Sequence, residues 1–187
     1  MRAPHAGATR GASTSGRYVC GVASIVHLAR RFFGSLSRSS PSAIDEQWAI
    51  AQLGSQEQAL WRRMDNADRR HAVGVARRVE TDLGSAASRP VLAAALLHDV
   101  GKLDSGLGTF ARAGATIWAG AIGRERASAG ASRVARYLRH DQIGAGLLLA
   151  ACADPLTIAW AREHHLDPSR WTLAHELASA LKNADDD

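Results

Sequence analysis

Apolar side chains recur at intervals of three and four residues from Asp45 onward, and Gly, Pro, Ser and Asp interrupt the pattern. This spacing places apolar groups on one face of an α-helix, whereas a half-buried strand would show an alternation that this chain lacks. At 187 residues the chain is long enough for one domain with a sizeable core. The sequence therefore predicts an all-α bundle, with helices near 45–53, 55–64, 67–83, 88–100, 106–122, 132–138, 141–152, 155–165 and 172–185.

Local signals mark several of the predicted helix ends. Ser55 followed by Gln58 is typical of a capping box, and Asp154 precedes a proline suited to a first helical turn. Gly84 and Gly101 follow apolar helical patterns, so both are interpreted as C-terminal stops.

Charge divides the chain into two parts. Positions 1–40 hold six arginines and no acid, which leaves 17 basic and 18 acidic residues beyond them. We expect residues 1–43 to form a basic, largely disordered segment and residues 44–187 to form one folded domain. Residues 25–36 have apolar positions at helical spacing, which predicts a short amphipathic helix that either docks on the domain or lies weakly on an anionic membrane face. The nearly neutral domain gives no support for nucleic-acid binding.

Cysteine usage and hydropathy bear on the compartment. Cys20 and Cys152 match no disulfide framework and no metal-ligand spacing, which favours a reducing compartment. The apolar stretch 18–36 is interrupted by Arg30 and Arg31, so it is too short and too charged to span a bilayer. No clean cleavage site for a signal peptide follows it, and we expect a cytoplasmic protein without a transmembrane segment.

Histidines and aspartates suited to metal binding are distributed through the predicted helices. Neutral imidazole and carboxylate are ligands of divalent transition metals, and several of them in one pocket would bind ions able to activate water. Five of the eight histidines belong to this set. Its members are His71, His98, Asp99, His140, His164, His165 and Asp185.

Helical geometry directs these side chains inward. His71 begins a row at intervals of four that continues through Val75 and Val79. Asp185 follows the apolar Leu181 by four residues, whereas the neighbouring acid Asp186 shares a face with a lysine. Because buried polar groups without partners cost several kcal/mol, a shared metal would remove that cost.

Asp99 occupies the position suited to a bridge. The stop predicted at Gly101 puts a helix carbonyl end, with its partial negative charge, beside His98 and Asp99. In a site with two ions about 3.5–4 Å apart, one carboxylate can contact both ions, and water held there becomes a nucleophile near neutral pH.

In this order, His71, His98-Asp99 within LHDVGK and the late Asp185 resemble the HD-domain superfamily of metal-dependent phosphohydrolases. His140 in HDQIGA and the doublet in REHH resemble the histidine-rich branch of that superfamily. The resemblance covers roughly residues 65–187 and implies an HD-domain helical bundle with two or three divalent metal ions.

The resemblance also implies a role for each matching residue. His71, His98, Asp99 and Asp185 correspond to ligands of a first ion, and Asp99 also reaches a second ion. His140, His164 and His165 would hold that second ion. The implied catalytic residues are Asp99 and Lys102, the latter contacting a substrate phosphate as a compact cation. The metal stays open, because imidazole suits iron, zinc and nickel while carboxylates also admit manganese or magnesium.

The implied activity is a phosphohydrolase or phosphodiesterase acting on a small nucleotide-like substrate. LDPSRW follows the histidine doublet in place of the Gly-Tyr-Pro motif of cyclic-dinucleotide phosphodiesterases, which argues against that substrate. Dinucleoside-polyphosphate hydrolases of the superfamily lack the motif, so a nucleotide or dinucleotide remains open. The alternative is a non-catalytic module of the same fold that acts by nucleotide sensing or protein contacts.

Other polar and aromatic residues receive structural interpretations. Arg112 is interpreted as a solvated surface residue, with phosphate binding as the alternative. Asp141 is interpreted as a helix cap or dipole partner. We expect His5, His27 and His175 to be exposed, and the five tryptophans to fill the core: Trp48, Trp61, Trp118, Trp160 and Trp171.

Overall fold

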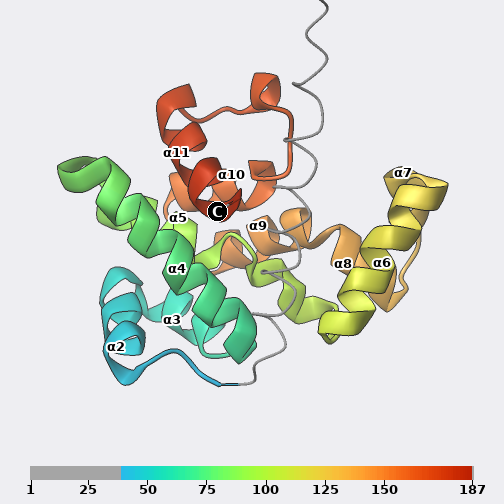
Figure 1. Cartoon of the computed structure of the whole chain (residues 1–187), viewed down its shortest axis with the longest axis horizontal. Helices are drawn as coiled ribbons and strands as arrows, with labels where there is room; N and C mark the ends of the chain where they lie inside the picture. The colour runs from blue at the N-terminus through green and yellow to red at the C-terminus, as the bar shows by residue number, and fades with distance from the viewer. Residues whose placement is uncertain (1–38, 187) are drawn as a thin grey trace, which may run out of the picture.

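The computed structural model describes residues 39–186, and all regular secondary structure in this part of the chain is helical, without strands (Figure 1). The all-α prediction is therefore confirmed. The α-helices are α2 (Ala43–Gln52), α3 (Ser55–Trp61), α4 (Asn66–Leu83), α5 (Arg89–Leu97), α6 (Thr109–Ile122), α7 (Arg124–Ala127), α8 (Arg133–Leu138), α9 (His140–Ala150), α10 (Pro155–Glu163) and α11 (His175–Asp186). Short 3-10 helices occupy η1 (Gly84–Ala86), η2 (Val100–Asp104) and η3 (Pro168–Arg170).

Helix α5 lies at the centre of the body. Every residue from Val91 to Leu97 is buried, and the helix packs against α2, α4 and α10. A helix that is apolar on all sides can remove its side chains from water only when other helices surround it. The central position of α5 therefore follows from its sequence. Helices α9 and α11 complete the body by packing on α10 and α4, respectively.

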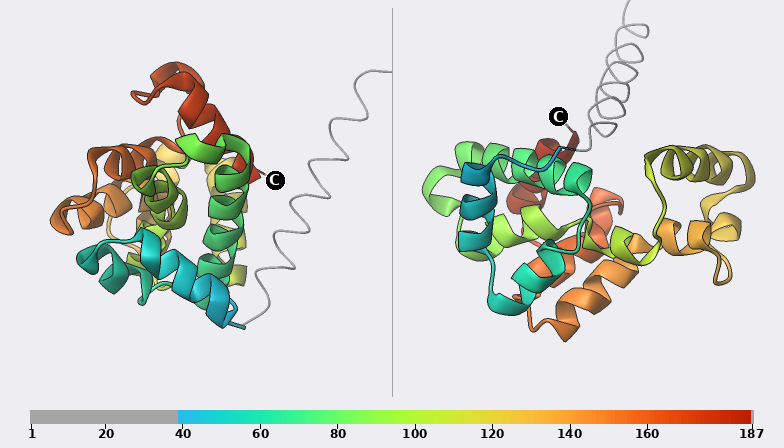
Figure 2. Two further views of the ribbon diagram at one scale, coloured as in Figure 1. Left: turned by 90° about the vertical axis from the view of Figure 1, so that its left-hand side faces the viewer. Right: turned by 90° about the horizontal axis from the view of Figure 1, so that it is seen from below.

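Helices α6, α7 and α8 form an arm that stands away from the body (Figures 1 and 2). Its small apolar cluster contains Ala119, Ala127 and Leu138. Trp118 of α6 is 47% exposed, so the prediction that all five tryptophans fill the core is wrong at this position. Because the apolar cluster between the helices of the arm is small and contains two alanines, it does not enclose the ring of Trp118.

The predicted capping box at Ser55 and Gln58 is wrong. The N-cap of α3 is Gly54, whose N–H donates to Glu57 Oε2 at 2.7 Å. Gln58 Nε2 instead donates to the carbonyls of Ile50 and Leu53, each at 3.1 Å, and so ties α3 to the end of α2. A long amide can reach a neighbouring helix end, where carbonyls lack helical partners.

Other predicted helix ends are confirmed. Asp154 caps α10, accepting a 2.9 Å hydrogen bond from Leu156 N at Oδ1. Gly84 ends α4 with a φ of 52°, in the left-handed region that favours glycine.

Gly101 has a different role from the predicted stop. Helix α5 ends earlier, at Leu97, and Gly101 lies within η2, which packs on α9. A Cβ at Gly101 would lie 1.9 Å from the His140 carbonyl oxygen and 2.5 Å from Gly144 N. Glycine is therefore required here because two backbones approach closely.

No helix in residues 39–186 is both long and apolar enough to cross a membrane. The amphipathic helix predicted at 25–36, together with Cys20, His5 and His27, lies outside the described residues.

The close approach of η2 to α9 predicts that Gly101→Ala destabilises the protein by about 3 kcal/mol, because backbone atoms cannot yield as a flexible side chain can. Urea unfolding measures the change. Gly146→Ala in α9 is the matched control, since nothing lies within 4 Å of its Cβ position. The control should stabilise by about 0.5–1 kcal/mol through helix propensity. Equal effects of the two substitutions would contradict this packing role.

Candidate metal centre

The structure brings together all seven residues predicted as metal ligands. They include two groups, and within each group the potential ligand atoms all lie within 4.8 Å of one another. Asp99 belongs to both groups. One group comprises His71, His98 and Asp99, and the other comprises Asp99, His140, His164 and His165. The side chains come from α4, the end of α5, the start of α9, the residues after α10, and α11.

The Asp99 carboxylate lies between the two groups. Its Oδ2 is 3.4 Å from His98 Nε2. Its Oδ1 is 3.2 Å from His140 Nε2 and 3.7 Å from His164 Nε2. Each group is therefore approached by one carboxylate oxygen, and the Asp99 residue is only 4% exposed.

Asp185 joins the first group from the last turn of α11. Its Oδ1 lies 2.9 Å from His71 Nε2 and 3.5 Å from His98 Nε2, and the residue is buried. Asp186, one residue later, is exposed and pairs with Lys182. Helical phase thus separates the two neighbouring acids as predicted, with one directed inward and one toward solvent.

Three of the histidines lie at helix ends and share one hydrogen-bonding arrangement. His98 and His164 are the C-cap residues of α5 and α10, and His140 follows the C-cap of α8. Carbonyls in the last turn of a helix have no helical partner and can accept other hydrogen bonds. The Nδ1 atoms of His98, His140 and His164 bond to the carbonyls of Ala95, Tyr137 and Ala161 at 2.9, 2.7 and 3.0 Å.

This arrangement fixes the ring nitrogen that faces the cluster. An Nδ1 that donates to a carbonyl carries the proton, so in the neutral ring the Nε2 lone pair is directed into the cluster. The Nε2 atoms of His98 and His164 are buried and have no hydrogen-bond partner. Buried ring nitrogens without a partner are costly, and a cation bound by both Nε2 lone pairs, with His98 neutral, would remove that cost.

Distances within the second group are those expected between ligands of one ion. Two ligand atoms each about 2.1 Å from an ion are about 3.0–3.4 Å apart at octahedral or tetrahedral angles. His140 Nε2 lies 3.1 Å from His165 Nε2 and 3.2 Å from Asp99 Oδ1. The residues present therefore fit a divalent metal, and these buried histidine and aspartate groups could hold one.

Protonated His98 and Lys102 balance the two buried carboxylates when no metal is bound. Burial lowers the pKa of His98, but Asp99 and Asp185 outweigh burial and raise it to about 10. Burial raises the pKa values of Asp99 and Asp185, but neighbouring cations and hydrogen bonds lower both below the usual range. Lys102 forms an ion pair with Asp99 Oδ2. The pKa of Lys102 is lowered by burial but raised overall by Asp99 and Asp68.

The other histidines with shifted pKa values favour the neutral form that binds metal. Burial is the largest cause of the lowered pKa values of His71, His164 and His165. His165 is exposed as a residue, yet its ring lies against those of His140 and His164, with centroids 5.0 and 4.0 Å away. His165 and the 27%-exposed His71 side chain mark the solvent side of the centre.

The prediction that Arg112 is a solvated surface residue is wrong. Its side chain is 13% exposed, and Nη1 donates to both carboxylate oxygens of Asp68 at 2.8 and 2.7 Å. Nη2 donates to Asp65 at 3.1 Å. The ion pairs join the arm to α4 across a separation of more than forty residues, so no local sequence pattern indicates them.

Sequence reasoning missed Asp68 and Tyr137. The charge of Asp68 helps to raise the pKa of Lys102. The ring of Tyr137 stacks on that of His140, with ring centroids 5.7 Å apart. The signal for Tyr137 was its place three residues before a ligand-type histidine at a helix end. His175 is exposed as predicted, and Asp141 lies in the first turn of α9, in agreement with its interpretation as a dipole partner.

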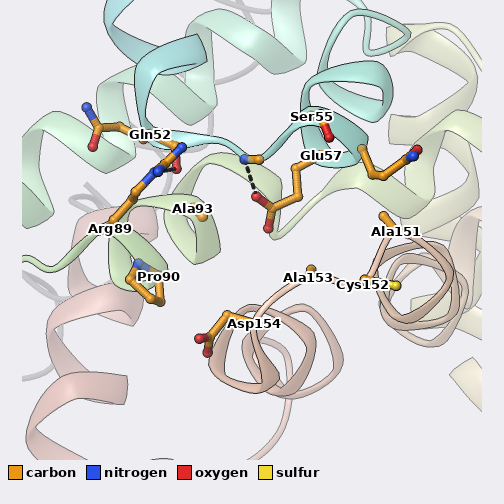
Figure 3. Close-up of a pocket in the computed structure, with 12 residues that line it drawn as sticks. Gln52, Ser55, Glu57, Arg89, Pro90, Ala93, Ala151, Cys152, Ala153 and Asp154 are labelled. Carbon is orange, nitrogen blue, oxygen red and sulfur yellow. Dashed lines mark hydrogen bonds between the residues drawn. The ribbon is translucent and has the colours of Figure 1, made fainter.

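A separate cavity of about 400 Å³ lies at the N-terminal end of α5 and contains none of the clustered histidines (Figure 3). Two charged residues in its wall make local bonds. Arg89 donates to the carbonyls of Gln52 and Leu53, and Glu57 accepts from Gly54. These bonds give the charged residues a structural role in joining α2, α3 and α5.

No protein-family model, curated protein or solved structure matches the chain. The geometry of the histidine and aspartate groups is therefore the basis for inferring function.

The charge on His98 predicts that Mn²⁺ binding at pH 8 releases about one proton per protein, because ligation requires a neutral imidazole. Since the pKa of His98 is about 10 without metal, affinity should fall about tenfold for each pH unit below that value. Calorimetry in two buffers with different ionisation enthalpies counts the protons. His175→Gln, at an exposed position, should leave the count unchanged. Binding heats that do not depend on the buffer would contradict this role of His98.

Proposed function

We propose that the protein is a metal-dependent phosphohydrolase that cleaves a phosphate ester or anhydride of a nucleotide-like substrate. The observation that supports this proposal best is the buried Asp99 carboxylate, which presents one oxygen to each of two imidazole groups. A carboxylate that can contact two ions is a recurring feature of two-metal hydrolytic sites.

In this proposal two divalent ions are held by separate ligand sets. His71, His98, Asp99 and Asp185 would hold the first ion. Asp99 and three histidines would hold the second: His140, His164 and His165. Bound ions would supply activation of water and neutralisation of charge on a phosphoryl group. The ligand types suit iron, manganese, zinc or nickel, and the carboxylates also admit magnesium.

The chain's own groups position the substrate and manage charge. Lys102 pairs with Asp99 when no metal is present, and its side chain is 18% exposed on the edge of the centre. Metal ligation by Asp99 would free the ammonium group to bind a phosphoryl oxygen. The helix-end carbonyls of Ala95, Tyr137 and Ala161 keep the imidazoles oriented throughout.

The order along the chain of the residues that resemble the HD-domain superfamily supports the same proposal. The LHDVGK sequence supplies His98, Asp99 and Lys102, and REHH supplies the doublet. Because LDPSRW stands in place of Gly-Tyr-Pro, we propose a mononucleotide or a dinucleoside polyphosphate rather than a cyclic dinucleotide.

Replacing Asp99 by Ala should abolish phosphohydrolase activity and lower the bound metal, since the shared ligand of both groups is lost. Metal analysis and a screen of metal-loaded protein against phosphoesters and dinucleotides measure both effects. Asp141→Asn is the control, because this acid lies in the first turn of α9 and accepts a hydrogen bond from Gln142 N. Unchanged metal content and activity in Asp99→Ala would refute the mechanism. Binding of nucleotides without turnover under every metal would favour a non-catalytic sensing module.

Replacing Lys102 by Met should keep the metal content but lower kcat by about 10²-fold, as for other donors that stabilise developing charge. Steady-state kinetics with the best substrate from the screen measures the change. Lys182→Met is the matched control, because Lys182 pairs with Asp186 on the outer face of α11. Equal rates for Lys102→Met and the control would remove Lys102 from the proposed machinery.

A further inference from the structure

Helix α6 packs with its small side chains and exposes its large ones. Ala115 and Ala119 are buried, with Ala119 in the cluster that joins α6 to α7 and α8. Ile117, Trp118 and Ile122 are 76%, 47% and 38% exposed. They are three of the five large apolar residues that are exposed among the side chains the structure describes, and they lie within six positions of one helix. A clustered apolar face of this kind marks a contact surface.

The described chain begins next to the stretch of α4 that binds α6. The Ser39 carbonyl accepts a hydrogen bond from Arg70 in α4. Arg112, in the first turns of α6, binds Asp68 in the same stretch of α4. Figure 1 shows the described chain starting next to the N-terminal end of α4, on the side of the molecule from which the arm extends. Residues 25–36 are therefore separated by only two positions, 37 and 38, from Ser39, which is held on α4 close to the residue of α4 that binds the arm.

The segment 25–36 has the length and pattern to cover the exposed face. Four of its large apolar residues share one helical face, Ile25, Leu28, Phe32 and Leu36, and Arg30 and Arg31 lie away from it. As a helix the twelve residues would be about 18 Å long, against about 21 Å for the fourteen of α6. With Leu36 near the base of α6, Ile25 would reach toward Ile122 in an antiparallel pair.

We propose that residues 25–36 dock as a helix along the Ile117, Trp118 and Ile122 face of α6. The tether favours this occupant over a second copy, because short linkers give effective concentrations in the millimolar range. The exposed face extends over six positions, about 9 Å of helix, so it is far smaller than the patch of roughly 800 Å² that each partner of a stable complex buries.

Docking would also support the candidate metal centre. The arm contributes Tyr137, whose carbonyl accepts the Nδ1 hydrogen of His140 and whose ring stacks on that histidine. A fourth helix packed on the arm would restrict the movement of the arm relative to α9. The docking surface itself does not depend on the proposed activity, so either proposal can fail alone.

The test uses the full chain and measures how strongly acrylamide quenches the fluorescence of Trp118. The fluorescence of Trp118 is obtained by subtracting the signal of the Trp118→Phe version of each protein from that of the protein itself. Leu28→Glu should remove the shielding of Trp118, because a carboxylate cannot be buried against the apolar face. His27→Glu is the matched control, since it places the same side chain on the opposite face of the segment. Circular dichroism verifies that the helical body is intact in both variants.

Equal quenching of Trp118 in the parent, Leu28→Glu and His27→Glu proteins would overturn the proposal. Shielding that increases with protein concentration, together with a dimer in sedimentation, would also overturn it in favour of a second copy. Ile122→Glu provides the reciprocal measurement from the arm, and it should raise hydrogen exchange in residues 25–36. If exchange there stays unchanged while the α6 variant remains folded, the segment does not lie on this face.

Discussion

The burial of the Asp99 carboxylate is the constraint on which the rest of the site depends. A carboxylate that is 4% exposed requires compensating positive charge, because desolvation costs several kcal/mol for an unpaired ion. Protonated His98 and Lys102 provide that charge when no metal is present. The same negative charge attracts a divalent ion, which can displace the proton of His98. A bound divalent ion would thus neutralise the same buried charge that protonated His98 and Lys102 balance in its absence.

Helix ends convert this electrostatic requirement into fixed geometry. His98, His140 and His164 each use Nδ1 to satisfy a last-turn carbonyl, which leaves Nε2 directed at the centre. The position at which each helix ends therefore sets the direction of these three Nε2 atoms. The predicted helices 88–100 and 155–165 run too far, because helical periodicity continues past the residues at which α5 and α10 end. Because α5 ends at Leu97 and α10 ends at Glu163, His98 and His164 become C-cap residues and direct Nε2 at the centre.

Close packing beyond the ligands holds the two halves of the centre together. Gly101 lets η2 approach the start of α9, which brings Asp99 within reach of His140. The ion pair of Arg112 with Asp68 joins the arm to α4 near Lys102. Neither contact has a local sequence signature, since each depends on atoms contributed by a segment distant in the chain.

The sequence alone determined the helical class, the inward direction of His71 and Asp185, and the identity of the residues that gather. These properties follow from helical periodicity and side-chain chemistry, which are local and can be counted along the chain. Only the tertiary structure decided that Gly101 serves a close approach, that Arg112 pairs with Asp68 of α4, and that Trp118 is exposed. Those outcomes depend on how helices pack and where they end, and helix packing is set by contacts between distant segments.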